Sequence, residues 1–257
     1  EALNLRDKFS DDRRTEISDV AGEVDIEDLI PLEECVITKT VNGYIKRLPS
    51  DTYNVQHRGG RGITGMTTRE EDSVENMFVC SSHDRIMLFS NFGRVYRIKA
   101  YEIPEASRTS RGTAIINLIP LQPEEKITAM IPLKEYEEDK YLFMATKRGI
   151  VKKTSVTDYA NIRKTGLAAI NLREDDELIE VKFTDNEQDI ILITKQGQCI
   201  RFDEKDVRAT GRTSMGVRGI NLSSKDDVVA MQMCSQGEQI LIVSEKGLGK
   251  RTVMEEF

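Results

Sequence analysis

The chain has 257 residues, of which 32% are charged, and its net charge at pH 7 is −7. This size fits one large or two ordinary globular domains. The sequence excludes a membrane-spanning helix, because no apolar run approaches the length of about 18 residues that such a helix needs. The charged N-terminal residues do not have the apolar region of a secretory signal peptide. We therefore expect a globular protein with a polar surface and no membrane partner.

Cysteine and histidine are few and scattered. The four cysteines are Cys35, Cys80, Cys199 and Cys234, none of them in a C-x-x-C pair. Each lies in or beside an apolar run, so we expect reduced, mostly buried thiols in a cytoplasmic protein rather than disulfides or metal ligands. The two histidines, His57 and His83, form no zinc-ligand pattern with them.

Residues 1–34 differ in charge from the rest of the chain. They hold 12 Asp or Glu and 4 Lys or Arg, which leaves 32 acidic and 33 basic residues in 35–257. We expect the end of a helix up to about Asp12, a short extended piece over residues 13–17 and an acidic linker over 22–28. The predicted domains are therefore a leader (1–34) and a nearly neutral main domain (35–257), whose local fields can still attract a polyanion.

From Cys35 onward the sequence repeats with a period of about 50 residues. Each repeat opens with an apolar strand, a turn glycine and a second strand that carries cations. The turn glycines are Gly43, Gly93, Gly149, Gly197 and Gly247. Asn42-Gly43 is the strongest dipeptide signal for a tight hairpin, which needs a positive φ at the glycine. The pattern predicts four repeats and the opening hairpin of a fifth.

A second glycine follows each of the first four turn glycines by 17–19 residues. These glycines are Gly62, Gly112, Gly166 and Gly216. We expect each to be followed by an apolar strand, which carries Ile-Asn-Leu at 116–118, 170–172 and 220–222, then by an acidic turn and another apolar strand. Four short strands per repeat predict an all-β fold, a propeller-like ring of four-stranded blades that bury apolar side chains against each other.

A cation stands four residues after every turn glycine. These cations are Arg47, Arg97, Lys153, Arg201 and Arg251. A ring would present five such side chains at one radius and height, which favours a functional basic belt. The simpler interpretation, solvated strand ends, stays open.

Residues 56–62 combine three glycines with two arginines and a histidine. The segment consists of Gln56, His57, Arg58, Gly59, Gly60, Arg61 and Gly62. Glycine lets the main chain approach a ligand closely, and arginine binds phosphate in a bidentate fork, so the composition suits phosphate. The alternative is a flexible solvated loop.

The motifs together resemble one known family, the C-terminal domain of the A subunit of bacterial DNA gyrase. The resemblance rests on Gly-Tyr-Ile-Lys-Arg at 43–47, the segment 56–62, Tyr-Glu-Ile-Pro-Glu at 101–105, Gly-Val-Arg-Gly-Ile at 216–220 and Gly-Lys-Arg at 249–251. Residues 1–34, with Asp-Arg-Arg-Thr-Glu-Ile at 12–17, resemble the end of the cleavage core and the tether to this domain in that family. The resemblance implies a β-pinwheel, a propeller-like ring whose neighbouring blades exchange a strand. It also implies that the domain wraps duplex DNA with positive writhe around a basic outer edge.

Segment 56–62 resembles the family's GyrA box, usually written Gln-Arg-Arg-Gly-Gly-Lys-Gly. His57 departs from the usual cation, and an unperturbed histidine, which titrates near about pH 6.5, is mostly neutral at pH 7. Wrapping needs phosphate contacts spread along a curved edge with little base readout. The candidate DNA-binding residues are the seven box residues together with Lys46, Arg47, Arg97, Arg111, Lys153, Arg201 and Arg251.

The resemblance also implies what the rest of the enzyme supplies. Gyrase is an ATP-dependent type II topoisomerase, and its DNA-cleaving tyrosine and its ATP and Mg²⁺ site lie in parts absent from this chain. The expected partners are double-stranded DNA, the rest of the A subunit and the B subunit in an A2B2 assembly, in the bacterial cytoplasm at the nucleoid. We expect no catalytic site and no cofactor in this chain, and a monomer when it is isolated.

Two alternatives stay open. The C-terminal domain of the A subunit of topoisomerase IV is the nearest, but its first blade lacks an intact box. A propeller used for protein contacts would instead need an apolar or aromatic surface patch. Phe257 follows the opening hairpin of the fifth repeat, whereas the family usually has six blades, so we expect a shortened chain or an incompletely closed ring.

Overall fold

A computed structural model describes residues 2–10, 26–53, 66 and 72–257. The chain forms two units, Glu1–Pro31 and Leu32–Phe257. The first contains α1 (Ala2–Phe9) and a 3-10 turn, Ile26–Leu29. The helix of the leader is therefore confirmed, whereas the extended piece expected over 13–17 lies outside the described residues.

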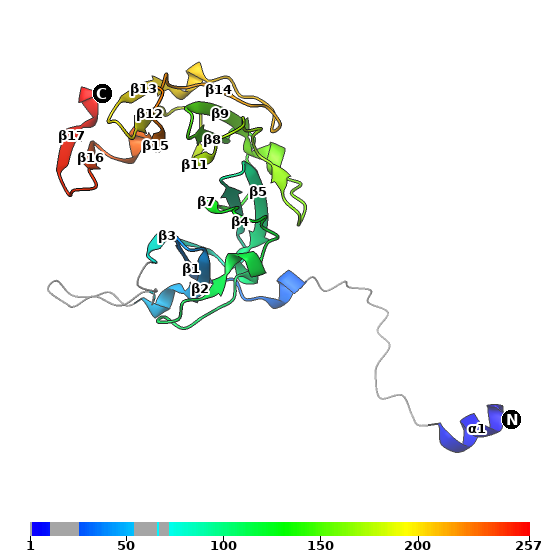
Figure 1. Ribbon diagram of the computed structural model, residues 1–257. Helices are drawn as coiled ribbons and strands as arrows, with labels where there is room; N and C mark the ends of the chain where they lie inside the picture. The colour runs from blue at the N-terminus through cyan, green and yellow to red at the C-terminus, as the bar shows by residue number, and fades with distance from the viewer. Residues whose placement is uncertain (1, 11–25, 54–65, 67–71) are drawn as a thin grey trace. The chain divides into compact units, whose positions relative to one another are not determined.

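The second unit consists of β-strands and short 3-10 turns (Figure 1). The strands are β1 (Glu34–Thr40), β2 (Tyr44–Pro49), β3 (Val74–Ser81), β4 (Arg85–Ser90), β5 (Arg94–Lys99), β6 (Thr113–Ala114), β7 (Ile127–Leu133), β8 (Tyr141–Thr146), β9 (Ile150–Ser155), β10 (Leu167–Ala168), β11 (Leu178–Thr184), β12 (Asp189–Thr194), β13 (Cys199–Asp203), β14 (Val217–Arg218), β15 (Val228–Met233), β16 (Gln239–Val243) and β17 (Gly249–Val253). The 3-10 turns are Ser50–Thr52, Ala100–Glu102, Ile115–Asn117, Val156–Tyr159, Glu204–Asp206, Cys234–Gln236 and Met254–Glu256.

The strands form five antiparallel sheets, which we number as blades in chain order. Their strand orders are β3-β1-β2-β6, β7-β4-β5-β10, β11-β8-β9-β14, β15-β12-β13 and β16-β17. The all-β fold with four-stranded blades is thus confirmed. The fourth strand of each complete blade comes from the following repeat: β6 follows β5 in the chain but pairs with β2. Each four-stranded sheet is therefore built from two consecutive repeats.

The hairpins form where the turn glycines predict them. Gly43 has a φ of 80° and Gly149 a φ of 78°, a left-handed conformation that other residues adopt at a cost. A hydroxyl at the end of each preceding strand supports the turn. In the first blade, Thr40 Oγ1 accepts a hydrogen bond from the Tyr44 amide, and in the third Thr146 Oγ1 accepts one from the Ile150 amide.

The Ile-Asn-Leu triplets are not strands, contrary to the sequence-based prediction. The exchanged strands are two-residue segments that end just before each triplet, and Ile115–Asn117 is a 3-10 turn. Ile170 and Ile220 instead pack against the turn glycine of the preceding blade, and so does Ile115, which stands just before the first triplet. Ile116, within that triplet, is exposed. The amides of Ile115, Ile170 and Ile220 donate hydrogen bonds to the carbonyls of Gly43, Gly93 and Gly149. These contacts fasten each new repeat to the hairpin tip of the blade before it.

Apolar cores lie between consecutive blades. One core combines Ile37 and Ile45 of blade 1 with Ile86 and Leu88 of blade 2. Two further cores join blades 2 and 3 and blades 3 and 4 in the same way. All four cysteines are free thiols; Cys35 and Cys80 are buried, whereas Cys199 is exposed.

Candidate nucleic-acid interface

The predicted box lies outside the described residues. Gln56, His57, Arg58, Gly59, Gly60, Arg61 and Gly62 all fall within 54–65. The interface is therefore built from the equivalent segments of the later repeats. We call each segment between the second hairpin strand and the exchanged strand a connector: residues 100–112, 156–166 and 204–216. Each connector ends at the second glycine of its repeat, which is also where the box ends in the first repeat.

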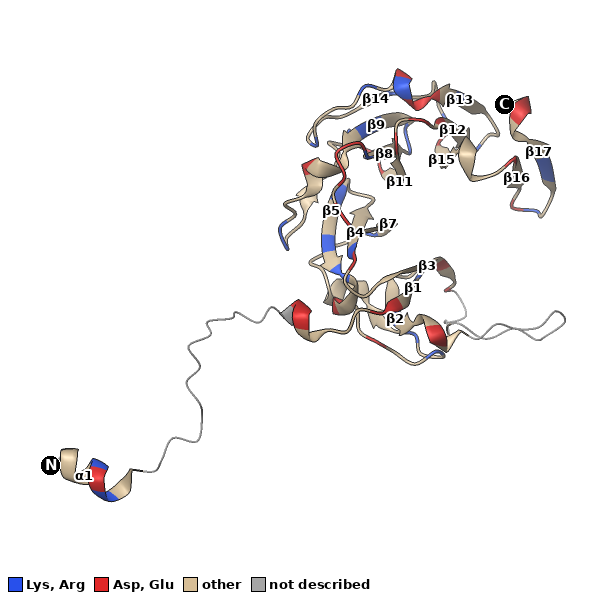
Figure 2. Ribbon diagram, turned by 180° about the vertical axis from the view of Figure 1, so that it is seen from behind, with Lys and Arg blue, Asp and Glu red and all other residues tan. Residues whose placement is uncertain are grey.

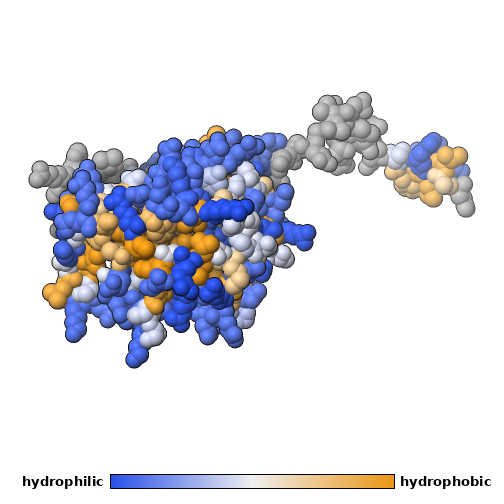
Figure 3. Space-filling model, turned by 90° about the horizontal axis from the view of Figure 1, so that it is seen from above, coloured by the Kyte–Doolittle hydropathy of each residue, from blue (hydrophilic) through white to orange (hydrophobic). Residues whose placement is uncertain are grey.

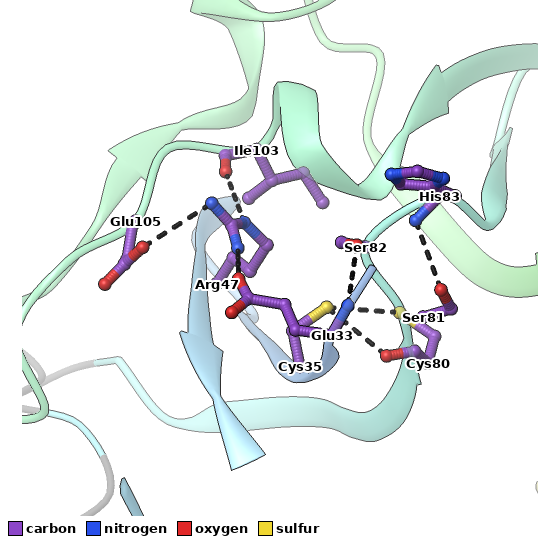
Figure 4. Close-up of polar contacts among 9 residues, drawn as sticks. All are labelled: Glu33, Cys35, Arg47, Cys80, Ser81, Ser82, His83, Ile103 and Glu105. Atoms are coloured by element: carbon purple, nitrogen blue, oxygen red, sulfur yellow. Dashed lines mark hydrogen bonds and ion pairs between the residues drawn. The ribbon is translucent and has the colours of Figure 1, made fainter. Parts of the chain in front are cut away.

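Arg47, four residues after the first turn glycine, is held by its own chain rather than by solvent. Its side chain is only 12% exposed, with an ion pair of 2.9 Å to Glu33 and another of 3.6 Å to Glu105. Its Nε donates to the Ile103 carbonyl at 3.3 Å. Ile103 and Glu105 belong to the connector of the next repeat, so Arg47 joins two repeats (Figure 4).

The equivalent cations of the next two blades do the same. Arg97 donates to the carbonyls of Ala160 and Ile162 in the connector of the third repeat, at 2.7 and 3.4 Å. Lys153 is buried, and its Nζ donates to the Glu204 carbonyl at 2.8 Å in the connector of the fourth repeat. Main-chain carbonyls of the next repeat are thus the shared partner.

The last two cations of this set are more exposed. Arg201 pairs with Asp189 at 2.6 Å and donates to the Met254 carbonyl at 3.0 Å, in the turn that follows β17. Arg251 lies exposed on β17. In four blades, therefore, the cation four residues after the turn glycine clamps the blade to the following repeat.

Two buried lysines, three residues after a turn glycine, hold the connectors at a second point. The Lys46 Nζ donates to the carbonyls of Ser107, Arg108 and Ser110, at 3.3, 2.6 and 3.0 Å. In the third blade, the Lys152 Nζ donates to the carbonyls of Ala169 and Arg212. Such hydrogen bonds satisfy carbonyls that are otherwise costly to bury.

Burial perturbs these ammonium groups. It lowers the pKa of Lys152 to about 8, an effect that Asp158 partly opposes. Burial also lowers the pKa of Lys46 and of Lys153, and for Lys153 Glu204 acts in the opposite direction. A side chain that has lost this much contact with water is poorly placed to contact a phosphate on the surface.

Four of the predicted DNA-binding residues thus have a structural role within the chain, and their contact with DNA stays a prediction. Lys46 and Lys153 are buried, and Arg47 and Arg97 are engaged by the next connector. The clamp formed by this cation in four of the five blades accounts for the regular sequence pattern there. Repetition alone cannot distinguish a clamp from a ligand-binding belt, since both place one cation at one position per blade.

Other cations lie on the connectors, and several of them were not among the predicted DNA-binding residues. When the connectors are aligned on their final glycine, Arg108 and Arg212 occupy the position of Arg58 in the box, four residues before the glycine. Arg108 is exposed and Arg212 half-buried, and the third repeat has exposed Arg163 and Lys164 next to this position. Alignment on the second glycine is the signal that would have found them.

Arg111 is the connector cation that the sequence-based prediction did include. It lies one residue before Gly112, as Arg61 does before Gly62. Its guanidinium stacks over the Tyr44 ring at 5.2 Å, a cation–π contact with blade 1. Its buried Nε has no hydrogen-bond partner among the described residues. The stacking contact joins the connector to blade 1, and a contact of Arg111 with DNA stays a prediction. Figure 2 shows Lys and Arg on β5, β9 and β17 and on the connector that leads into β14.

Two other features are absent from the part of the chain that the structure describes, a cluster of metal-ligating side chains and a membrane-spanning helix. No group of three or more His, Cys, Asp or Glu there could hold a metal ion. No helix among those residues is long and apolar enough to cross a membrane. Apolar side chains do gather on one face of the second unit, bordered by hydrophilic ones (Figure 3). Exposed apolar residues include Ile200 on β13 and Leu241 on β16.

Comparison with known proteins adds independent evidence. The family model described as "DNA gyrase C-terminal domain, beta-propeller" matches residues 36–81, 84–134, 140–185, 188–235 and 238–257. The A subunit of a DNA gyrase from Staphylococcus aureus is 46% identical over 262 residues, which cover all of this chain and 29% of that protein. The chain spans less than a third of the length of the curated relatives it matches.

Two solved structures share the fold. The C-terminal domain of DNA topoisomerase IV superposes with a TM-score of 0.76 at 29% identity, over 89% of this chain and 70% of that one. A DNA gyrase A C-terminal domain superposes with a TM-score of 0.67 at 30% identity, over 87% and 72%. The family match extends over each of the five blades defined above, and on this evidence the chain belongs to the DNA gyrase C-terminal domain family.

Proposed function

We propose that this chain binds duplex DNA along its connectors and wraps it with positive writhe. The observation that carries the proposal is the recurrence of a connector cation: Arg58, Arg108 and Arg212 stand at one position in three repeats. The main-chain carbonyls of Arg108 and Arg212 are held by the buried Lys46 and Lys152. The backbone is thus fixed at the position from which each guanidinium projects.

This arrangement suits a polyanion read by its backbone. Phosphate contacts supply affinity without sequence information, and a series of them, one connector per repeat, can follow a bent duplex. Bending a site of 20–30 bp costs on the order of 1–6 kcal/mol, which distributed contacts can offset. The box residues 56–62 are the first connector position of the series.

The finer parts of the proposal follow from the family. In the whole protein, the wrapped segment would be delivered to the cleavage gate of a type II topoisomerase, which then introduces negative supercoils. We propose that the chain works in a cytoplasmic, nucleoid-associated complex with A2B2 composition. The parts of the enzyme outside this chain would use ATP and Mg²⁺.

A charge-matched pair of variants tests the connectors. The first replaces Arg108, Arg163 and Arg212 with Gln, and the control replaces the exposed lysines Lys126, Lys134 and Lys225 with Gln. Binding to a duplex of about 150 bp, one persistence length, is measured by mobility shift at several salt concentrations. We expect the connector variant to lower the slope of log K against log salt by about 0.9 for each phosphate that the protein no longer neutralises. Equal slopes in the two variants would remove the connectors from the interface.

The box is tested by topology. The chain is bound to nicked circular DNA, the nick is ligated, and the trapped writhe is measured. We expect positive writhe with the unmodified chain and much less with Arg58→Ala combined with Arg61→Ala. Unchanged writhe in the double variant contradicts the role of the box, and the absence of positive writhe with the unmodified chain contradicts wrapping itself.

A further inference from the structure

Two cysteines of blade 1 face each other across neighbouring strands. Cys35 of β1 is the direct register partner of Cys80 of β3. Their sulfur atoms lie 3.8 Å apart, and the Cys35 Sγ lies 3.4 Å from the Cys80 carbonyl (Figure 4). Both are free and buried. This is a paired thiol site that the DNA-binding function does not use.

The strand geometry is compatible with a disulfide. Directly opposed residues on antiparallel strands have Cβ atoms about 4.5–5.5 Å apart, and a disulfide needs about 3.5–4.5 Å. A small approach of the two strands is therefore enough. The backbone beside the pair is already fixed: the Ser82 amide donates to the Glu33 carbonyl at 2.8 Å, and the Glu33 amide donates to the Ser82 Oγ at 3.2 Å.

The two thiols differ in their surroundings. The hydrogen bond between the two sulfur atoms lowers the pKa of the Cys35 thiol; burial opposes this shift, and the Arg47 guanidinium contributes to it. The pKa of Cys80 is raised, first by the hydrogen bond to Cys35 and then by burial. Thiolate is the reactive form, so these directions favour attack by Cys35, with Cys80 as the resolving thiol.

We propose that Cys35 and Cys80 form a redox modification site, which a peroxide converts reversibly into a disulfide. The Cys35 thiolate attacks one peroxide oxygen, the O–O bond breaks, and Cys35 becomes a sulfenic acid as one water is formed. The Cys80 sulfur then attacks the Cys35 sulfur, the S–S bond forms and the sulfenic oxygen leaves as a second water. Two thiols and one hydrogen peroxide thus give one disulfide and two waters.

The position of the pair lets an oxidant reach it, and it determines which part of the chain a disulfide would enclose. β3 is an edge strand of its sheet, so local opening of that edge exposes both sulfurs to a small molecule. The bond would close a loop from residue 35 to residue 80, which contains the first hairpin and the box segment 56–62. Loop closure restricts the unfolded chain and stabilises blade 1.

The test treats the 257-residue chain with hydrogen peroxide, unfolds it, alkylates the remaining thiols and maps the peptides by mass spectrometry. We expect a linked peptide that joins Cys35 and Cys80, with two fewer alkylated thiols, and restoration of both by dithiothreitol. The thermal midpoint of the oxidised chain should rise by roughly 10 °C, from a loop of this length.

Matched variants separate the pair from the other cysteines. Cys35→Ser and Cys80→Ser should each abolish the linked peptide and the rise in midpoint, whereas Cys199→Ser should change neither. The proposal is overturned if peroxide oxidises the exposed Cys199 while Cys35 and Cys80 remain fully alkylatable. It is equally overturned if Cys35 proceeds to sulfinic acid without a link to Cys80. Both outcomes are read from the unmodified chain, so they do not depend on how the variants fold.

Discussion

Blades 3 and 4 start from similar hairpins but end in different environments. Their first strands, β8 and β12, share one burial pattern, a half-buried residue followed by five buried ones. The second strands differ: β9 is buried over its first five residues, whereas β13 is mostly exposed. β9 has β14 on its outer side, and within the described residues β13 pairs with β12 alone. A repeat therefore makes its own hairpin, but the second strand of that hairpin is buried only where the next repeat adds an exchanged strand.

The largest effect should come from blocking strand exchange at Gly112. Gly112 and Gly197 have the same φ, 82°. A Cβ at Gly112 would overlap the Ile45 carbonyl oxygen, whereas a Cβ at Gly197 has nothing within 4 Å. We expect Gly112→Ala to lower the free energy of unfolding by at least about 3 kcal/mol and Gly197→Ala by about 1 kcal/mol. Denaturant unfolding measures both, and equal losses would show that β6 does not depend on this close approach.

The next effect should come from the buried lysine of blade 3. Lys152→Met leaves the carbonyls of Ala169 and Arg212 without their ammonium donor. We expect a loss of about 2 kcal/mol in unfolding free energy. Two buried carbonyls without a donor destabilise the fold by more than the removal of a buried ammonium group stabilises it. Ile200, at the same position of blade 4, is exposed. Ile200→Met should stay within about 0.5 kcal/mol, and an equal loss there would contradict the comparison.

The clamp arginines should show a smaller contrast. Arg97 donates to two carbonyls of the next connector, whereas Arg251 lies exposed on β17. Arg97→Gln should therefore destabilise the chain by about 1–2 kcal/mol, and Arg251→Gln by less than about 0.5 kcal/mol. Thermal or denaturant unfolding of both variants provides the measurement. A neutral Arg97→Gln would make that residue a candidate phosphate ligand again.

The smallest effect should appear as a pH dependence. The pKa of Lys152 is about 8 in the folded chain and 10.5 in its ordinary state. Between these values the unfolded chain binds more protons than the folded one, so the unfolding free energy contributed by this lysine rises with pH. We expect the unmodified chain to gain about 1 kcal/mol relative to Lys152→Met between pH 8 and pH 9. A difference that is constant with pH would mean that Lys152 titrates normally.

The hairpins could be predicted because their determinants are local. Asn42 and Gly43 specify a turn whatever surrounds them. A glycine between two apolar strands recurs at Gly93 and Gly149. The direction of strand exchange could not be predicted from local pattern, because β6 contributes only Thr113 and Ala114 to its sheet. The sequence-based prediction assigned the strands to the neighbouring Ile-Asn-Leu triplets instead, because these triplets recur in three repeats.

The candidate site was only partly predictable for a related physical reason. Lys46 and Arg47 read as surface cations because charged side chains are rarely buried without partners. Their partners include main-chain carbonyls of residues 103–110. Every residue has such a carbonyl, so the amino-acid sequence does not reveal these partners. The connector residues Arg108 and Arg212 carry less regular patterns, and they become visible only after the repeats are aligned on their second glycine.

Each four-stranded blade takes its last strand from the next repeat, and this limits how the chain can change in length during evolution. Every complete sequence repeat after the first contributes its exchanged strand to the blade before it and its remaining strands to its own blade. Duplication or loss of one whole repeat therefore preserves the junction between each pair of consecutive blades, with its strand pairing and its clamp. A gain or loss of any other length would leave one blade with an unpaired edge and its neighbour with a surplus strand. The number of blades can thus change by the gain or loss of whole repeats, while the hydrogen bonds within each junction remain the same.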